Sequence, residues 1–450
     1  MVYNMLKPSC CYLRSVDPCF KDKFMEISIN YFRSQASQYK IYLKSSFLYL
    51  FSSLFTSVIG ILVNPFMAKN LSPEDYAIMG YFNSFSQIIL PILNFSLISY
   101  YLRNYYKIPD ERKQIVSDTI LIALLVYGFV ALTLTCVVFY YYCRLSKISF
   151  SFYPFALLTF APIYLGNFAT LYLVNCRLKR EAGRFSTMTI LSALLGTLLA
   201  ILLVVICKYG ATGRLLATLL ASVVTAAYCF KQLFGKLQFD FAVIKEAFRF
   251  GWPLSLSSML WYFLSGVDRA MLEKLHDSYT FGFYNVGMQI AGYLAFFYTA
   301  IAQTFEPDIY RAIAENKKRK LVKIILGILS LNAIPNIIFI LFAPLIIGLL
   351  TYDRYTGASG FAQILALKNI SVALYYSLNS VVIGYGFTKS HLMLMIIGAI
   401  INFIVYKYLI LNFAFCGAAW GQVVSMIIMS ALSIMFIIYM YRGKYQVVHK

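Results

Sequence analysis

The sequence has little charge and little of the chemistry that soluble enzymes use. Only 13% of its 450 residues are charged, and only three are histidine: His276, His391 and His449. Nine cysteines are present, but no two of them form a CxxC pair. We therefore expect neither a metal site nor a disulfide framework. The sequence also gives no candidate catalytic residue and no sign of a cofactor.

What the sequence has instead is apolar length, with 60% hydrophobic residues gathered in runs such as Thr189–Ile206 and Leu392–Leu411. Such runs can cross a hydrocarbon layer of about 30 Å at about 1.5 Å per residue. We predict an all-α integral membrane protein with about twelve transmembrane helices. The predicted spans are 46–67, 80–101, 118–142, 152–174, 187–206, 214–230, 248–267, 280–304, 324–343, 359–385, 392–411 and 417–440. The sixth span is short, which leaves a count of eleven open.

Acidic residues are scarce, with 18 Asp and Glu against 39 Lys and Arg, a net charge of +21. With both ends inside, 29 of the basic residues fall in inner segments and 8 in outer loops, leaving Lys368 and Lys407 within spans. This bias predicts cytoplasmic termini, formed by residues 1–45 and 441–450. It accounts for most of the basic charge without a nucleic-acid partner.

The chain has no long polar loop on either side of the predicted membrane. A membrane-embedded polymerase or acyltransferase acting on sugars is expected to build its site from a sizeable polar loop or domain. The absence of one favours a protein that moves its substrate over an enzyme that modifies it.

Two segments of the chain repeat each other. Residues 80–88 read GYFNSFSQI, and residues 282–290 read GFYNVGMQI, 202 positions later. Six predicted spans separate the copies, so both halves have the same orientation. This predicts two pseudo-symmetric six-helix bundles, residues 46–247 and 248–440, around a central cleft.

The repeat carries amides at matching positions, Asn83 and Gln87 in the first half and Asn285 and Gln289 in the second. Residues four apart share one helix face. One interpretation is that these amides join helices by hydrogen bonds, as is common in membrane bundles. The other is that they form the polar wall of a cleft that receives a hydrated substrate.

Three charged residues stand out within or beside the spans. Lys368 lies well inside the tenth span, where a lone lysine costs about 2.5–3.5 kcal/mol. We expect it to face a wet cavity and to bind an anionic group, with snorkelling as the alternative. Asp268 and Arg269 end the seventh span at the outer surface, either as an interfacial anchor or local pair, or as a contact for sugar or phosphate at the mouth of the cleft.

Several motifs resemble the polysaccharide transporters, the Wzx-type O-antigen flippases of the multidrug/oligosaccharidyl-lipid/polysaccharide exporter superfamily. The motifs are MAKNLSPEDY at 67–76, FGWPL at 250–254, the pair Asp268-Arg269 followed by GFYN at 282–285, and EPDIY at 306–310. The resemblance covers roughly residues 46–440. Lys69 stands where the family usually has arginine, and Ala77 where it usually has glycine.

The resemblance implies a flippase that moves an undecaprenyl-pyrophosphate-linked oligosaccharide from the inner to the outer face by alternating access, for O-antigen or another surface polysaccharide. Its partners would be this substrate, membrane lipids and other polysaccharide assembly proteins. The alternatives are a multidrug exporter of the same fold, a membrane enzyme and a non-transporting scaffold. A drug/proton exporter needs a buried acid. None lies at mid-depth in the predicted spans, which counts against that alternative.

Overall fold

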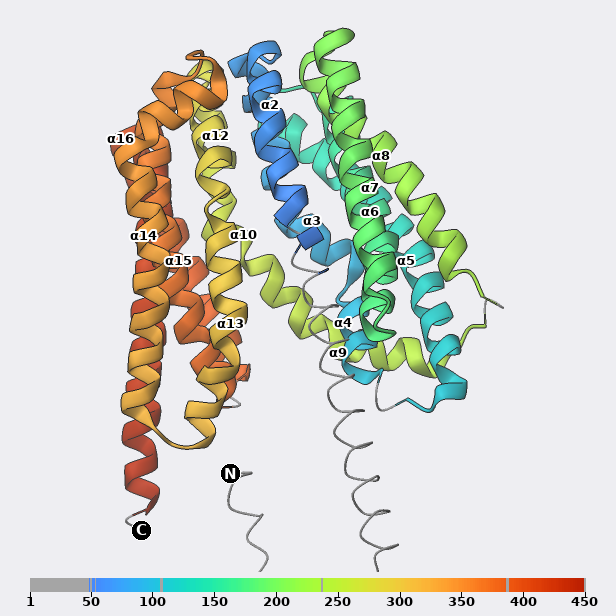
Figure 1. The fold of residues 1–450 in the computed structure, drawn as a ribbon, viewed down its shortest axis with the longest axis vertical. Helices are drawn as coiled ribbons and strands as arrows, with labels where there is room; N and C mark the ends of the chain where they lie inside the picture. The colour runs from blue at the N-terminus through green and yellow to red at the C-terminus, as the bar shows by residue number, and fades with distance from the viewer. Residues whose placement is uncertain are drawn as a thin grey trace, which may run out of the picture.

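The computed structural model describes residues 48, 51–52, 54–105, 108–235, 238–385 and 388–448. Within these ranges every regular element is helical (Figure 1). Seven helices among them are long and apolar enough to cross a membrane. The predicted all-α membrane fold is confirmed. The predicted N-terminal segment 1–45 lies outside the described residues.

The first half begins with a helix over residues 54–70. It is followed by α2 (Pro73–Ser84), α3 (Ser86–Asn94), α4 (Leu97–Asn104), α5 (Asp110–Leu145), α6 (Phe155–Leu178), α7 (Ala182–Ala200), the π-helical η1 (Ile201–Ile206) and α8 (Gly210–Leu233). The sixth predicted span falls within α8, which has 24 residues. It is among the helices long and apolar enough to cross a membrane.

The second half contains α9 (Phe241–Leu260), α10 (Tyr262–Ser265), α11 (Val267–Leu272), η2 (Glu273–Leu275), α12 (Ser278–Gly292), α13 (Ala295–Ala314), α14 (Lys318–Thr351), η3 (Thr356–Ala358), α15 (Ser359–Gly384) and α16 (Thr388–Val448). The eleventh and twelfth predicted spans are the two arms of α16, which meet at the non-helical residue Ala414.

The helices form two lobes, with α2–α8 on one side and α10–α16 on the other (Figure 1). α9 leads from the first lobe to the second at one end and packs against α3, α4 and α5. The α4–α5 connection, the α13–α14 turn and the end of α16 also lie at this end. Because these segments carry an excess of Lys and Arg, we call it the basic end. α2 begins at the opposite end.

The α13–α14 turn carries much of the charge of the basic end. Lys317 and Arg311 both contact Glu315, at 2.9 and 3.0 Å. These two cations lower the pKa of Glu315 to about 2. The acid is therefore ionised at neutral pH and engaged by its neighbours, and residues 318–320 add three more cations directly after this turn.

At the opposite end, the two lobes meet along α2 and α12. A Cβ atom on Gly80 would lie 2.1 Å from side-chain atoms of Asn285, and one on Gly282 would lie 2.1 Å from the Pro73 carbonyl oxygen. Gly80 and Gly282 are equivalent positions of the sequence repeat. Because glycine has only a hydrogen in place of a side chain at both positions, the two helices can approach closely.

A second set of contacts closes the same end. Arg354, in the α14–α15 connection, donates to the carbonyl oxygens of Ala68 and Lys69 at the end of the first helix. The Tyr355 hydroxyl donates to the Leu71 carbonyl, at 2.6 Å. Carbonyl groups at a helix C-terminus lack intrahelical donors and attract positive charge. Arg354 therefore holds the second lobe to the first where α2 and α12 meet.

Candidate functional site

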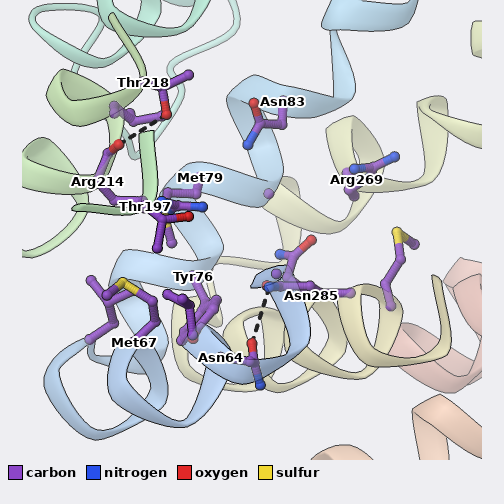
Figure 2. Close-up of a pocket in the computed structure, with 17 residues that line it drawn as sticks. Asn64, Met67, Tyr76, Met79, Asn83, Thr197, Arg214, Thr218, Arg269 and Asn285 are labelled. Carbon is purple, nitrogen blue, oxygen red and sulfur yellow. Dashed lines mark hydrogen bonds between the residues drawn. The ribbon is translucent and has the colours of Figure 1, made fainter. Parts of the chain in front are cut away.

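A cavity of about 370 Å³ lies between the lobes. We call it the central cavity (Figure 2). Both lobes contribute to its wall, and no acidic residue occurs among the described residues that line it. Its polar lining consists of Asn64, Tyr76, Asn83, Thr197, Arg214, Thr218, Arg269, Asn285 and Gln289. The cavity is therefore rich in amides and carries positive charge.

Three of the four amides of the sequence repeat line this cavity: Asn83, Asn285 and Gln289. Gln289 donates to the Asn64 side-chain oxygen at 3.1 Å, across the interface between the lobes. Asn285 donates to its own helix, to the Phe281 carbonyl at 3.0 Å. The amides thus serve both interpretations, because they form a cavity wall and one of them also joins the two lobes.

Gln87 is separated from Asn83 by a break in the helix. α2 ends at Ser84 and α3 starts at Ser86, so the expected shared face does not continue through Phe85. Gln87 accepts a hydrogen bond from the Ser265 hydroxyl at 2.8 Å. It lines a different cavity. The prediction that Asn83 and Gln87 lie on one face is wrong.

Arg214 comes from the first lobe, near the start of α8, and the chain positions it through α2. Ser72 and Asp75 form a capping box at the start of α2. Asp75 also accepts from the Ala211 backbone amide at 2.7 Å. Gly210, with φ +56°, leaves room for this carboxylate, since a Cβ there would lie 2.7 Å from Asp75 Oδ1. The first turn of α8 is thereby fixed, and Arg214 follows it.

Arg269 lines the cavity from α11 of the second lobe, and Asn83 lies between it and Arg214 in the view of Figure 2. Its Nη2 donates to the Ser265 carbonyl at 3.0 Å, while its Nε has no hydrogen-bond partner. Among the described residues, the Arg214 guanidinium forms no salt bridge. Two planar guanidinium groups on opposite walls can bind one anionic group from both sides.

Asp268 lies inside the second lobe rather than at its surface. It is fully buried, and its Oδ2 accepts from the Tyr284 hydroxyl at 2.5 Å and from Gln422 at 2.8 Å. Its Oδ1 lies 4.0 Å from Arg269 Nε. The predicted outer-surface position of Asp268 is wrong. The argument against a multidrug exporter from a missing buried acid therefore fails.

Lys368 lies on α15, and no salt bridge joins it to another described residue. Its side chain is only partly buried. It is absent from the described lining of the central cavity and of the cavity that holds Gln87. Its predicted contact with the substrate stays a prediction.

The cavity that holds Gln87 is larger, about 990 Å³, and lies towards the basic end. We call it the basic-end cavity. Phe85 and Tyr262 stack between the lobes, with ring centroids 5.5 Å apart, at the break between α2 and α3. A Cβ on Gly266 would lie 3.1 Å from the Ser84 carbonyl oxygen, so the backbones are also close there. These contacts lie between the Asn83 side and the Gln87 side of the broken helix.

Sequence reasoning missed Arg214, Asn64 and the basic-end cavity. Arg214 stands at the polar edge of the sixth predicted span, where it counts as one of the outer basic residues. Asn64 is a single amide within the first span. A signal for Arg214 was present, since Asp75 is a capping acid and Gly210 is a glycine at a helix start. The hydrogen bond that connects these two segments, however, joins Ala211 to Asp75, 136 positions apart.

Two helical lobes enclosing a cationic, amide-lined cavity define a polytopic membrane transporter. The chain belongs to the family of polysaccharide biosynthesis proteins, whose profile matches residues 42–307. A MatE profile matches residues 253–409. No curated protein matches the sequence.

Solved structures share the fold. One is the lipid II flippase MurJ in an inward closed conformation, with TM-score 0.66 and 15% identity, covering 86% of each chain. Another is an inward-facing multidrug resistance MATE family transporter of the MOP superfamily, with TM-score 0.64 and 17% identity, covering 86% of this chain and 96% of that one. A third is a MOP superfamily transporter from Pyrococcus furiosus, with TM-score 0.60 and 18% identity, covering 88% and 95%.

The close contact of α2 with α12 predicts how the molecule opens at the end opposite the basic end. Gly282→Leu is expected to force the two helices apart, because even a Cβ would collide with the Pro73 carbonyl. In a cysteine-free background, Asn83→Cys should then react with an impermeant maleimide added from that side. Gly292→Leu is the matched control on the same helix, since a Cβ there meets nothing within 4 Å. Equal labelling in the two variants would show that this contact does not seal the cavity.

Proposed function

We propose that the chain is a flippase that moves an undecaprenyl-pyrophosphate-linked oligosaccharide from the inner to the outer face of the bacterial cytoplasmic membrane. The observation that carries the proposal is the pair Arg214 and Arg269, which line one cavity from opposite lobes without an acidic residue among its described lining. A diphosphate is a compact group with several anionic oxygens, which suits two bidentate donors. The family, and the fold that the chain shares with MurJ, support the same class of activity.

The proposed mechanism is alternating access. The α2–α12 contact and Arg354 hold the opposite end closed, so the substrate enters from the basic end. The diphosphate binds between Arg214 and Arg269, and amides such as Asn83 and Asn285 hydrogen-bond the first sugars. Separation of α2 from α12 then releases the substrate on the outer side. The repeat unit is that of an O-antigen or a comparable surface polysaccharide.

A multidrug exporter is the second candidate, and it has a specific observation in its favour. Asp268 is a fully buried carboxylate, and the MatE profile covers the helices around it. The positive charge of the central cavity argues against this candidate, because Arg214 and Arg269 repel the cationic drugs that an acid-lined site attracts. Deleting the gene separates the two. A flippase predicts loss of surface glycan and accumulation of precursor at the inner face, whereas an exporter predicts sensitivity to drugs with normal glycan.

The proposed orientation predicts that both termini lie in the cytoplasm. Alkaline phosphatase fused after Val448 should be inactive, because this reporter folds only outside the cytoplasm, and a fluorescent protein fused there should be bright. Fusions within the α5–α6 connection, at residues 146–154, should give the reverse pattern. The physical reason is the excess of Lys and Arg at the basic end. An active phosphatase after Val448 would overturn the orientation.

A further inference from the structure

The basic-end cavity contains aromatic side chains that neither the proposed diphosphate site nor the closed end uses. Trp261, at the junction of α9 and α10, and Tyr376, on α15, both line it. Their rings are stacked, with centroids 5.4 Å apart and planes at 30°. Tyr298 on α13 continues the stack behind Tyr376, at 5.5 Å and 23°. Three helices of the second lobe therefore join in one aromatic stack, and two of its rings reach the cavity.

Polar groups accompany these rings. Gln87, Ser257 and Ser258 line the same cavity with amide and hydroxyl groups, and Arg103 and Arg249 add guanidinium groups. Arg103 lies over the Phe250 ring, with Cζ 4.9 Å from its centroid, which holds this guanidinium at the wall. The cavity thus combines an aromatic surface with hydrogen-bond donors and acceptors. A cavity for a lipid tail would need only the apolar surface.

We propose that the basic-end cavity is a carbohydrate subsite, in which a sugar ring of the cargo packs against the face of Trp261 opposite Tyr376, which supports the Trp261 ring from behind. This inference rests on the proposed function. One face of a pyranose ring presents weakly positive C–H groups, which match the negative face of an aromatic ring. The hydroxyl groups at the rim of the sugar need donors and acceptors, which Gln87 and the two serines supply. At about 990 Å³ the cavity lies at the upper end of the size range of ligand pockets.

The position of the cavity gives the subsite a role in the transport cycle. It lies towards the basic end, by which the proposed mechanism has the cargo enter. The Phe85–Tyr262 stack and the Gln87–Ser265 hydrogen bond separate it from the Asn83 side. The sugars would therefore occupy the basic-end cavity first and pass this constriction before the opposite end opens.

The three tryptophans of the sequence make the proposal measurable. Trp252 and Trp420 are 54% and 45% exposed, and neither lines the cavity. Replacing both by phenylalanine leaves Trp261 as the sole fluorophore of the full-length protein. We expect quenching of Trp261 by a prenyl-diphosphate-linked oligosaccharide, and none by the same prenyl diphosphate without sugar. Tyr376→Leu should weaken the apparent affinity about tenfold, a loss of ~1.4 kcal/mol. Equal quenching by the sugar-free lipid would overturn the proposal.

A cellular experiment separates failure of this inference from failure of the proposed function. At matched protein abundance, Trp261→Leu is expected to lower surface glycan about tenfold, Trp261→Phe to retain most of it because the ring face remains, and Trp252→Leu to match the wild type. Wild-type glycan from Trp261→Leu, in a strain whose gene deletion loses glycan, would reject the carbohydrate subsite alone. Normal glycan in the deletion strain would reject the flippase itself.

Discussion

Arg214→Ala and Arg269→Ala are each expected to lower surface glycan about tenfold or more at matched protein abundance. A hydrogen bond to a charged group contributes about 1.5–3 kcal/mol, and ~1.4 kcal/mol corresponds to a factor of ten. Each change removes one wall of the proposed diphosphate site. The lysine variants should fall between, because lysine keeps the charge but loses the planar, two-point geometry of the guanidinium.

A site shared by Arg214 and Arg269 also predicts how the two alanine substitutions combine. If both arginines bind the same diphosphate, the double alanine variant should lose less than the product of the two single losses, since the second change removes a partner of an already weakened site. Arg144→Ala, at an exposed arginine near the end of α5, is the matched control and should retain wild-type glycan. Independent losses, or an equal loss from Arg144→Ala, would reject a shared site.

The second large effect concerns Asp268 and Lys368. Asp268→Ala is expected to destabilise the protein by about 3–5 kcal/mol, because it removes the acid that lies 4.0 Å from Arg269 Nε and leaves that cation uncompensated in the second lobe. Lys368→Ala should also destabilise it and lower surface glycan, while Lys368→Arg retains part of the activity. Thermal unfolding of the purified protein measures the first effect, and surface glycan at matched abundance the second.

A double variant decides what Lys368 contacts. If the Lys368 ammonium compensates the charge of the Asp268 carboxylate, the Asp268→Ala/Lys368→Ala double variant should be more stable than the sum of the two single losses predicts, by about 0.5–3 kcal/mol. Additive losses of stability would instead mean that the two charges do not interact, and would favour direct contact of Lys368 with the cargo. Wild-type glycan from Lys368→Ala would remove this lysine from the site altogether.

The sequence alone predicted the spans and three of the cavity amides, and the reasons are physical. Long apolar runs have few folded alternatives to crossing a membrane, and the described residues of the predicted spans are mostly helical, although turns interrupt the spans 80–101, 248–267 and 280–304. Asn285 and Gln289 lie on the unbroken helix α12, where a spacing of four does place two residues on one face. The same spacing failed for Asn83 and Gln87, because the helix breaks at Phe85.

The depth of the charged residues could not be predicted in the same way. A hydropathy pattern ends a span where a charge appears, so Arg214, Asp268 and Arg269 all fall at predicted outer edges. In the structure, the seventh pass continues beyond Leu260 as α10 and α11, which pack against α16. Asp268 is thereby buried and Arg269 reaches the cavity. These placements follow from contacts between residues far apart in the chain, which no local pattern contains.

Reconstitution tests the central claim most directly. The purified protein is placed in vesicles with a short-chain prenyl-diphosphate oligosaccharide that carries a fluorophore on its sugar, and a reductant that cannot cross the membrane bleaches the outer leaflet. We expect wild-type vesicles to lose more fluorescence than empty ones. Vesicles with the Arg214→Ala/Arg269→Ala double variant should match empty ones. Bleaching in wild-type vesicles no greater than in empty ones, or equal bleaching with the double variant, would contradict a flippase that carries its diphosphate between these two arginines.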